Sequence, residues 1–311
     1  MTRAYGKYTK VRKDILVMNK IKRGIGERMF EVINILIMCC LCVVMLYPMI
    51  HVLCASFSSP QFMSGHKGIL LWPKEFTVNA YKLMARNPMI LKGYINTLTI
   101  LLFGVTLNIV LTSMGAYVLS RKSFAMRNKI MMMIVFTMYF SGGIIPFYFT
   151  VRTLGMENSL LALILPSAIS TYNVIIMRTS FLSIPDSLEE SARLDGAGHF
   201  VILFKIVMPL SKAVIAVMIL YYAVGHWNSW FNAMLFLSDR KKFPLQLILR
   251  EILIQNDTSA MVQNVGIGEQ GLIGETVKYA VIIVSTVPIL CIYPFIQKYF
   301  EKGVMIGAVK G

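Results

Sequence analysis

Residues 185–209 read PDSLEESARLDGAGHFVILFKIVMP, a polar stretch with a helical pattern that lies between long apolar runs. Its first half favours a short helix. Asp186 and Glu189 fit a capping box, and Glu189 and Arg193 stand one helical turn apart, where opposite charges attract. Because this helix is polar and is flanked by apolar runs, we expect it to lie at a membrane surface as a contact region.

Gly196 and Gly198 are expected to end this helix and to bend the chain. A second short helix is predicted after the bend, because apolar residues recur there at spacings of three and four. These residues are Phe200, Leu203, Phe204 and Val207. Pro209 then restarts the chain into the next apolar run. The predicted unit is therefore a helix, a bend and a second helix.

The composition excludes a soluble fold, because 56% of the 311 residues are hydrophobic, 15% are charged and the mean hydropathy is +0.65. The net charge of +16 fits either nucleic-acid binding or membrane topology. Nine of the 31 lysines and arginines lie in residues 1–30, and others gather beside apolar runs. This distribution favours the positive-inside rule over a phosphate-binding stripe. The five cysteines show no zinc-ligand spacing with histidine, so no metal site is predicted.

Six long apolar runs without Asp or Glu predict an all-α membrane protein with six transmembrane helices. They cover residues 32–55, 93–120, 130–151, 160–177, 210–236 and 279–297. Two glycines and a proline near the outer end of the third run predict a broken helix there. Polar residues inside the second run, which include Asn108 and Ser113, should face other helices or a wet pathway.

An even number of crossings places both termini on the same side of the membrane, and the basic N-terminal tail favours the cytoplasmic side. The predicted location is a bacterial cell membrane. The predicted divisions are a basic N-terminal tail over 1–28, a membrane domain over 29–300 and a C-terminal tail over 301–311. External loops are expected at 56–93, with a short helix at 79–86, and at 238–277.

Part of the first stretch resembles the EAA loop of ABC importer permeases. The matching residues are Glu190, Ser191, Ala192, Gly196, Ile206, Met208 and Pro209, with Ser191 in place of Ala and Met208 in place of Leu. From about Ser56 onward the chain is also similar to carbohydrate-uptake permeases of the maltose-transporter type. The segments that carry this resemblance are WPKEFT (72–77), Asn96-Thr97, AYVLSR (116–121), GGIIPFY (142–148) and GAVKG (307–311).

The resemblance implies a type I ABC importer permease fold, in which residues 186–195 form a cytoplasmic coupling helix that docks onto an ATPase subunit. The implied docking residues are Glu189, Glu190, Ser191, Ala192, Asp195, Gly196 and Pro209. It also implies that Lys310 in the C-terminal tail contacts the ATPase. The implied partners are a second permease, two ATP-binding subunits and an external solute-binding protein. The alternative interpretation of the acidic residues is a solvated helix face.

The predicted spans contain no carboxylate relay for a proton-coupled or sodium-coupled carrier, and the chain contains no GxxxxGK[ST] motif. We therefore predict a translocation subunit without enzymatic activity, whose energy comes from ATP and magnesium bound by partner ATPase subunits. This chain itself is predicted to bind no cofactor.

Sugars commonly stack on aromatic rings and bond to amides and hydroxyls, and the end of the fifth run supplies both kinds of group. Its candidate pathway residues are Tyr221, His226, Trp227, Asn228 and Trp230. An interfacial aromatic belt is an equally good interpretation of these residues. The C-terminal segment KYFEKGVMIGAVKG (298–311) and the segment PLQLILRE (244–251) look most similar to the permease subgroup that imports oligosaccharides from complex polysaccharides. A permease for another solute, a self-sufficient secondary transporter and a membrane scaffold stay open as alternatives.

Overall fold

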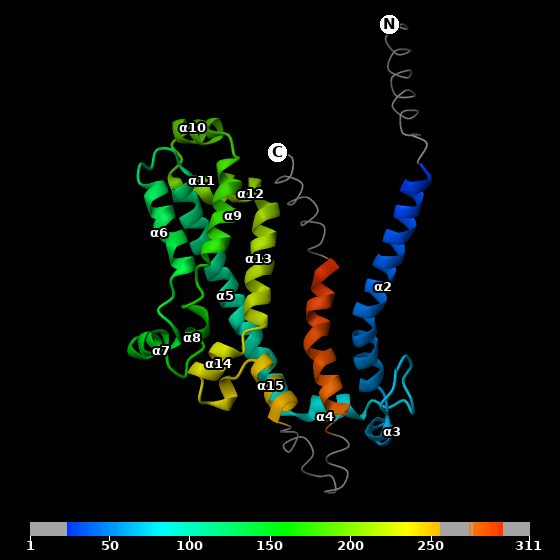
Figure 1. Cartoon of the computed structure of the whole chain (residues 1–311). Helices are drawn as coiled ribbons and strands as arrows, with labels where there is room; N and C mark the ends of the chain where they lie inside the picture. Colours follow the sequence, from blue (N-terminus) through cyan, green and yellow to red (C-terminus); the bar gives the residue numbers. More distant parts are fainter. Residues whose placement is uncertain (1–23, 256–273, 275, 295–311) are drawn as a thin grey trace. The chain divides into compact units, whose positions relative to one another are not determined.

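The computed structural model describes residues 24–255, 274 and 276–294, and within these ranges all regular secondary structure is helical (Figure 1). The prediction of an all-α protein is confirmed for this part of the chain. Two compact units are present, one with described residues 24–51 and 69–71 and the other with residues 52–68 and the described residues from 72 onward.

The smaller unit contains most of α2 (Ile25–Ser56), the helix predicted as the first span. The helices of the larger unit, in chain order, are α3 (Pro60–Gly65), α4 (Asn79–Arg86), α5 (Pro88–Ser120), α6 (Arg127–Tyr139), α7 (Ile144–Thr153), α8 (Leu161–Ile164), α9 (Thr171–Leu182), α10 (Asp186–Leu194), α11 (His199–Ile202), a π-helical turn (Leu203–Val207), α12 (Met208–Leu210), α13 (Lys212–Trp227), α14 (Phe231–Phe236), a 3₁₀ turn (Arg240–Lys242), α15 (Leu245–Gln255) and the helix Thr276–Pro294.

Helix α5 is the central element of the larger unit and packs against α9, α13 and α15 (Figure 1). It has 33 residues, so it is about 50 Å long. Pro88 occupies its first turn, and the Asn87 side chain accepts a hydrogen bond from the Met89 backbone N–H at 2.8 Å. Asn108 and Ser113 are completely buried between helices, as predicted.

By length and composition, three helices in the described part of the chain could cross a membrane: α2, α5 and Thr276–Pro294. Two bent pairs raise this number to five if each is counted as one span. The first is α6 with α7, and the chain bends by 115° between these helices, at the break predicted near Gly142 and Gly143. The second joins His199–Leu210 to Lys212–Trp227 at 89°.

The predicted fourth span at 160–177 is not one continuous helix. Helix α8 ends at Ile164, and α9 begins only at Thr171. Pro166 lies in the break, where it cannot supply a backbone N–H for a helical hydrogen bond. The apolar run therefore contains two short helices separated by a non-helical segment.

The predicted external loop at 238–277 is also more structured than expected, and residues 256–273 and 275 of it lie outside the described residues. Helix α15 is largely buried and packs against α5. The Asn96 side chain donates to the backbone oxygens of Lys241 and Phe243, and Thr97 accepts from the Leu245 backbone N–H at 2.9 Å. The Asn96-Thr97 pair thus holds the start of this segment against α5. The short helix predicted at 79–86 is confirmed as α4.

Gly93 permits the close approach of α5 and α15. A Cβ atom at Gly93 would lie 2.7 Å from Ile248 Cδ1 and 3.1 Å from the backbone Cα of Leu245. We expect Gly93→Ala to destabilise the protein by about 1–3 kcal/mol and to lower its melting temperature in detergent. Gly115→Ala in the same helix meets no atom within 4 Å and should be neutral or slightly stabilising. Equal melting temperatures for the two variants would contradict this packing.

Candidate functional site

The predicted contact helix is present as α10, which begins after Pro185. The capping box predicted between Asp186 and Glu189 is wrong, because no side chain caps the helix start. Asp186 instead accepts a hydrogen bond from Lys122 Nζ at 2.7 Å. The predicted pair one turn apart is confirmed, since Arg193 Nη2 donates to Glu189 Oε1 at 2.6 Å.

Gly196 ends α10 in the left-handed conformation, with φ at +83°. The Gly196 N–H donates to the Arg193 carbonyl oxygen at 3.0 Å, and the Ala197 N–H donates to the Ala192 carbonyl oxygen at 2.9 Å. These two bonds form a Schellman motif, which satisfies carbonyl groups that the end of the helix leaves open. The predicted bend is confirmed at Gly196.

Glu189 lies on the inner side of α10 and is only 8% exposed. Its carboxylate accepts hydrogen bonds from Arg121 Nη1, from Tyr117 OH at 3.0 Å and from Arg193. Arg121 also donates to the Phe181 carbonyl oxygen at 3.2 Å, and its guanidinium carbon lies 4.8 Å from the centroid of the Tyr117 ring. We call Glu189, Arg121, Tyr117 and Arg193 the Glu189 junction. It fixes α10 to the end of α5.

The charges of the junction keep Glu189 ionised. Burial alone would raise the pKa of Glu189, but the charge of Arg121 and the hydrogen bonds from Arg121, Tyr117 and Arg193 outweigh burial and hold the pKa below its ordinary value. Removing one partner of a buried pair of this kind typically costs about 3–5 kcal/mol, since the other charge stays buried alone. The exposed ion pair between Lys122 and Asp186 contributes far less to the stability of the fold.

The other predicted docking residues of α10 differ in exposure, and Ala192 packs against the core cluster that contains Ala116 and Tyr117 of α5. Glu190, Ser191 and Asp195 are exposed, and Ala192 is half-buried. Leu194, one turn after Glu190, is 90% exposed. A carboxylate and a leucine therefore share one outward stripe of α10, a pattern suited to a partner with basic and apolar groups.

The second predicted helix consists of α11, the π-helical turn and α12, which contains Pro209. Its predicted apolar face is only half correct. Leu203 and Val207 are buried against α5 and α9, whereas Phe200 and Phe204 are exposed. The change of helix type rotates the buried face, which explains why a simple spacing rule misplaced the phenylalanines.

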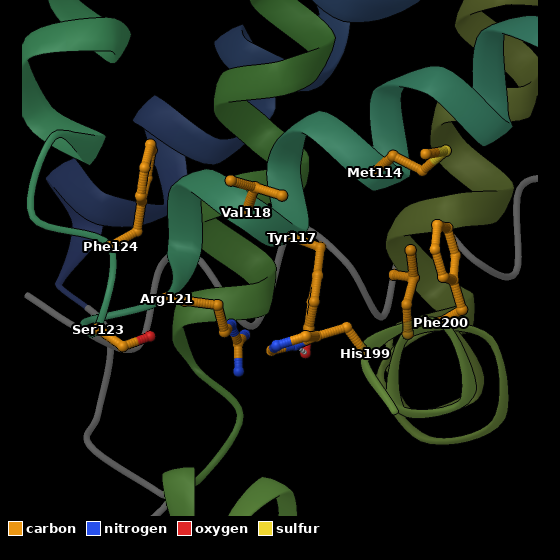
Figure 2. Close-up of a pocket in the computed structure, with 9 residues that line it drawn as sticks. Met114, Tyr117, Val118, Arg121, Ser123, Phe124, His199 and Phe200 are labelled. Atoms are coloured by element: carbon orange, nitrogen blue, oxygen red, sulfur yellow. Dashed lines mark hydrogen bonds between the residues drawn. The ribbon is translucent and has the colours of Figure 1, made fainter. Parts of the chain in front are cut away.

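A cavity of about 360 Å³ lies between the end of α5, residues 123–124 and α11 (Figure 2). Its wall is mostly apolar, with Tyr117, Arg121 and His199 converging on one side (Figure 2). The Tyr117 hydroxyl and His199 Nδ1 are 3.3 Å apart. The cavity therefore borders the Glu189 junction.

A second cavity, of about 690 Å³, lies among the break between α8 and α9, the start of α9 and the end of α13. Its polar lining residues are Ser167, Ser170, Tyr172, Asn173, Tyr221, Tyr222, His226, Ser229 and Asn232. The Tyr172 and Tyr221 ring centroids are 6.4 Å apart, and both side chains are exposed. We call this space the polar cavity. It offers hydroxyl, amide and imidazole groups beside two aromatic faces.

The wall of the polar cavity is tied to α5 by buried hydrogen bonds. Asn108 Nδ2 donates to the carbonyl oxygens of Ser167 and Ala168 at 2.6 and 2.9 Å, so its Oδ1 is free to accept from His226 Nε2 at 2.8 Å. One turn later, the hydroxyls of Thr112 and Tyr222 are 2.7 Å apart. The Asn108 side chain thus satisfies carbonyls that the break in the fourth apolar run leaves without helical partners.

The structure separates the five residues predicted for the substrate pathway. Tyr221 and His226 line the polar cavity, but the other three do not. Trp227 is buried in the apolar core and donates to the Ser285 carbonyl oxygen at 3.2 Å. Asn228 follows the end of α13. The guanidinium carbon of Arg250 lies 4.1 Å from the centroid of the Trp230 ring. Lys310 lies outside the described residues.

Sequence reasoning expected Tyr117 to face other helices or a water-filled pathway and placed Arg121 at the inner end of the second run, but it linked neither residue to Glu189. It also did not predict the break that lines the polar cavity. A contact between residues 68 positions apart leaves no periodic trace in the sequence.

The backbone of Gly196 gives a direct test of how α10 ends. An added Cβ would meet no atom within 4 Å, so only the left-handed φ opposes a side chain. We expect Gly196→Ala to cost about 1–2 kcal/mol, measured as a lower melting temperature in detergent. Gly196→Asn should cost clearly less, because Asn adopts this conformation more readily. Equal losses for Ala and Asn would contradict a conformational role for Gly196.

Comparisons with known proteins agree with this architecture. Residues 21–306 match the family described as "Binding-protein-dependent transport system inner membrane component". The chain is 41% identical to the polygalacturonan/rhamnogalacturonan transport system permease protein YtcP of Bacillus subtilis (strain 168), over 92% of this chain and 99% of the relative. It is 38% identical to protein LplC of the same organism, over 96% of this chain and 99% of the relative.

A solved structure of a bacterial ABC transporter involved in the import of the acidic polysaccharide alginate contains a similar chain. The TM-score is 0.82 at 32% sequence identity, over 89% of this chain and 98% of the other. The resemblance seen in the sequence is confirmed. This protein belongs to the family of inner membrane components of binding-protein-dependent transport systems.

Proposed function

We propose that this chain is the membrane permease subunit of an ATP-driven importer of oligosaccharides released from complex polysaccharides. The observation that carries the proposal is the two-sided helix α10, which is fixed to α5 through Glu189 and presents Glu190 and Leu194 outward. The relatives named above, one for polygalacturonan and rhamnogalacturonan and one from an alginate importer, support the substrate class.

The proposed topology has six crossings, with both termini and the EAA loop at 185–209 in the cytoplasm. The bent pair of α6 with α7 forms the third crossing, and the short helices α8 and α9 together form the fourth. Broken helices are compatible with a membrane where the non-helical backbone lines a cavity, and Ser167, Ile169 and Ser170 of the break line the polar cavity. This arrangement matches the type I importer permease fold implied by the sequence.

The proposed complex contains a second permease, two ATPase subunits that bind ATP and magnesium, and an external solute-binding protein. Closure of the ATPase dimer on ATP would draw α10 inward and rotate the helices from an inward-facing to an outward-facing state. ATP drives the change through its different affinity for the two states. The docking role of Pro209 and the ATPase contact of Lys310 belong to this proposal.

The polar cavity is the proposed sugar pathway in this subunit. Tyr172 and Tyr221 supply ring faces for stacking on the apolar faces of a sugar, and His226 and the serines supply hydrogen-bonding groups. Trp227 and Trp230 have supporting roles in the fold, because both are engaged elsewhere.

The docking face is tested by charge reversal. We expect Glu190→Lys to leave the protein in the membrane but to abolish co-purification with the ATPase and sugar uptake, since the outward carboxylate is lost. Glu157→Lys is the matched control, because Glu157 pairs with Arg152 in a segment proposed to lie outside the cell. ATPase association should be measured with the full complex. Normal association and uptake by Glu190→Lys would contradict the docking role.

The pathway is tested with oligosaccharides from digested polygalacturonan as the transported probe. We expect Tyr221→Ala to raise the KM for uptake about 2- to 12-fold, which corresponds to the loss of one aromatic contact of about 0.5–1.5 kcal/mol. Tyr139→Ala is the control, since Tyr139 is exposed at the end of α6 and does not line the polar cavity. An unchanged KM in Tyr221→Ala, or the same change in both variants, would refute the assignment.

A further inference from the structure

The Glu189 junction and the wall of the polar cavity lie on the same helix. Arg121 directly follows the last residue of α5 and Tyr117 lies in its last turn, while Asn108 and Thr112 lie in the preceding turns. From Asn108 to Arg121 the helix rises about 20 Å. One continuous element therefore reaches from the docking helix to groups that bond to His226 and Tyr222.

This part of α5 is one unbroken helix that packs closely against its neighbours. It contains no proline, and the side chains of Thr112, Ser113 and Ala116 are completely buried. Ser113 donates to Met177 Sδ of α9 at 3.3 Å. Close packing on the buried side leaves this part of the helix little room to bend independently of its neighbours.

The tie between α10 and α5 is concentrated in the Glu189 junction. The other side-chain ion pair between α10 and the residues that follow α5 joins Lys122 and Asp186, whose side chains are 72% and 52% exposed. An ion pair this exposed to water holds α10 only weakly in position. The Glu189 carboxylate, by contrast, is held by three donors in a buried setting, where a change of position would leave charges unpaired.

We propose that Arg121 and Tyr117 are positioning residues that join α10 rigidly to α5, so that α5 carries the movement of α10 to the wall of the polar cavity. Movement of α5 shifts Asn108 and Thr112, and with them the hydrogen bonds to His226 and Tyr222. Glu189 thus connects α10 to α5 inside the subunit. The outward stripe of α10, with Glu190 and Leu194, contacts the partner ATPase. This inference rests on the proposed function, because it presumes that α10 is moved by an ATPase.

The test uses the full complex in lipid nanodiscs with its ATPase and solute-binding protein. The ratio of ATP hydrolysis with and without the binding protein loaded with polygalacturonan oligosaccharides is measured for Glu189→Gln, Arg121→Met and the double variant. Glu189→Gln leaves the buried Arg121 without a carboxylate, and Arg121→Met leaves the buried Glu189 with the partly exposed Arg193 as its remaining charged partner. Both variants should therefore lower the melting temperature and the stimulation ratio. The double variant removes both charges and should recover the melting temperature.

The double variant distinguishes transmission from stability. We expect its stimulation ratio to stay at least about 5-fold below that of the wild type, the lower end of typical coupling between sites, although its stability returns. Recovery of both properties would overturn the proposal, because the pair would then serve stability alone. Lys122→Gln, next to Arg121 in the chain, should leave the ratio unchanged.

Two milder variants keep the proposal testable if the double variant fails to assemble. Tyr117→Phe removes one hydrogen bond at the junction, and Thr112→Val removes one at the cavity wall, while both keep the charge pair. Both should lower the stimulation ratio, and unchanged ratios in both would overturn the proposal. A wild-type complex that binds no ATPase would overturn the proposed function itself, and this inference with it.

Discussion

A buried carboxylate must find positive partners, and this constraint shapes the candidate docking site. Glu189 is buried on α10, and the cost of removing its charge from water is offset only because Arg121, Tyr117 and Arg193 surround it. The α10 helix is held against the end of α5 as a result. The Schellman motif at Gly196 then turns the chain so that α11 packs back towards the same bundle.

The same rule explains the polar cavity. Backbone carbonyls released by the break between α8 and α9 would be unsatisfied in a lipid environment, and the Asn108 amide bonds to two of them. The fixed orientation of that amide leaves its oxygen for His226. A structural requirement of the broken helix therefore brings polar groups to one place, where they serve transport in the function proposed here.

The sequence predicted those features that depend on local pattern. Helix α4, the end of α10 at Gly196 and the break between α6 and α7 all follow from nearby residues, and each was found. Features that depend on distant contacts were missed. The predicted capping box failed because Glu189 bonds to Arg121 across 68 residues, and Trp227 was assigned to the pathway because composition does not show which side of α13 faces the core.

Joint movement of α10 and the end of α5 is the property on which the proposed coupling depends. Its most direct measurement is the distance between spin labels at Ser191→Cys on α10 and Ser123→Cys just after α5, with the five native cysteines replaced, in the full complex without and with trapped ATP. We expect this distance to stay the same to within about 2 Å while the complex changes state. A change approaching one helical turn, about 5.4 Å, would contradict it.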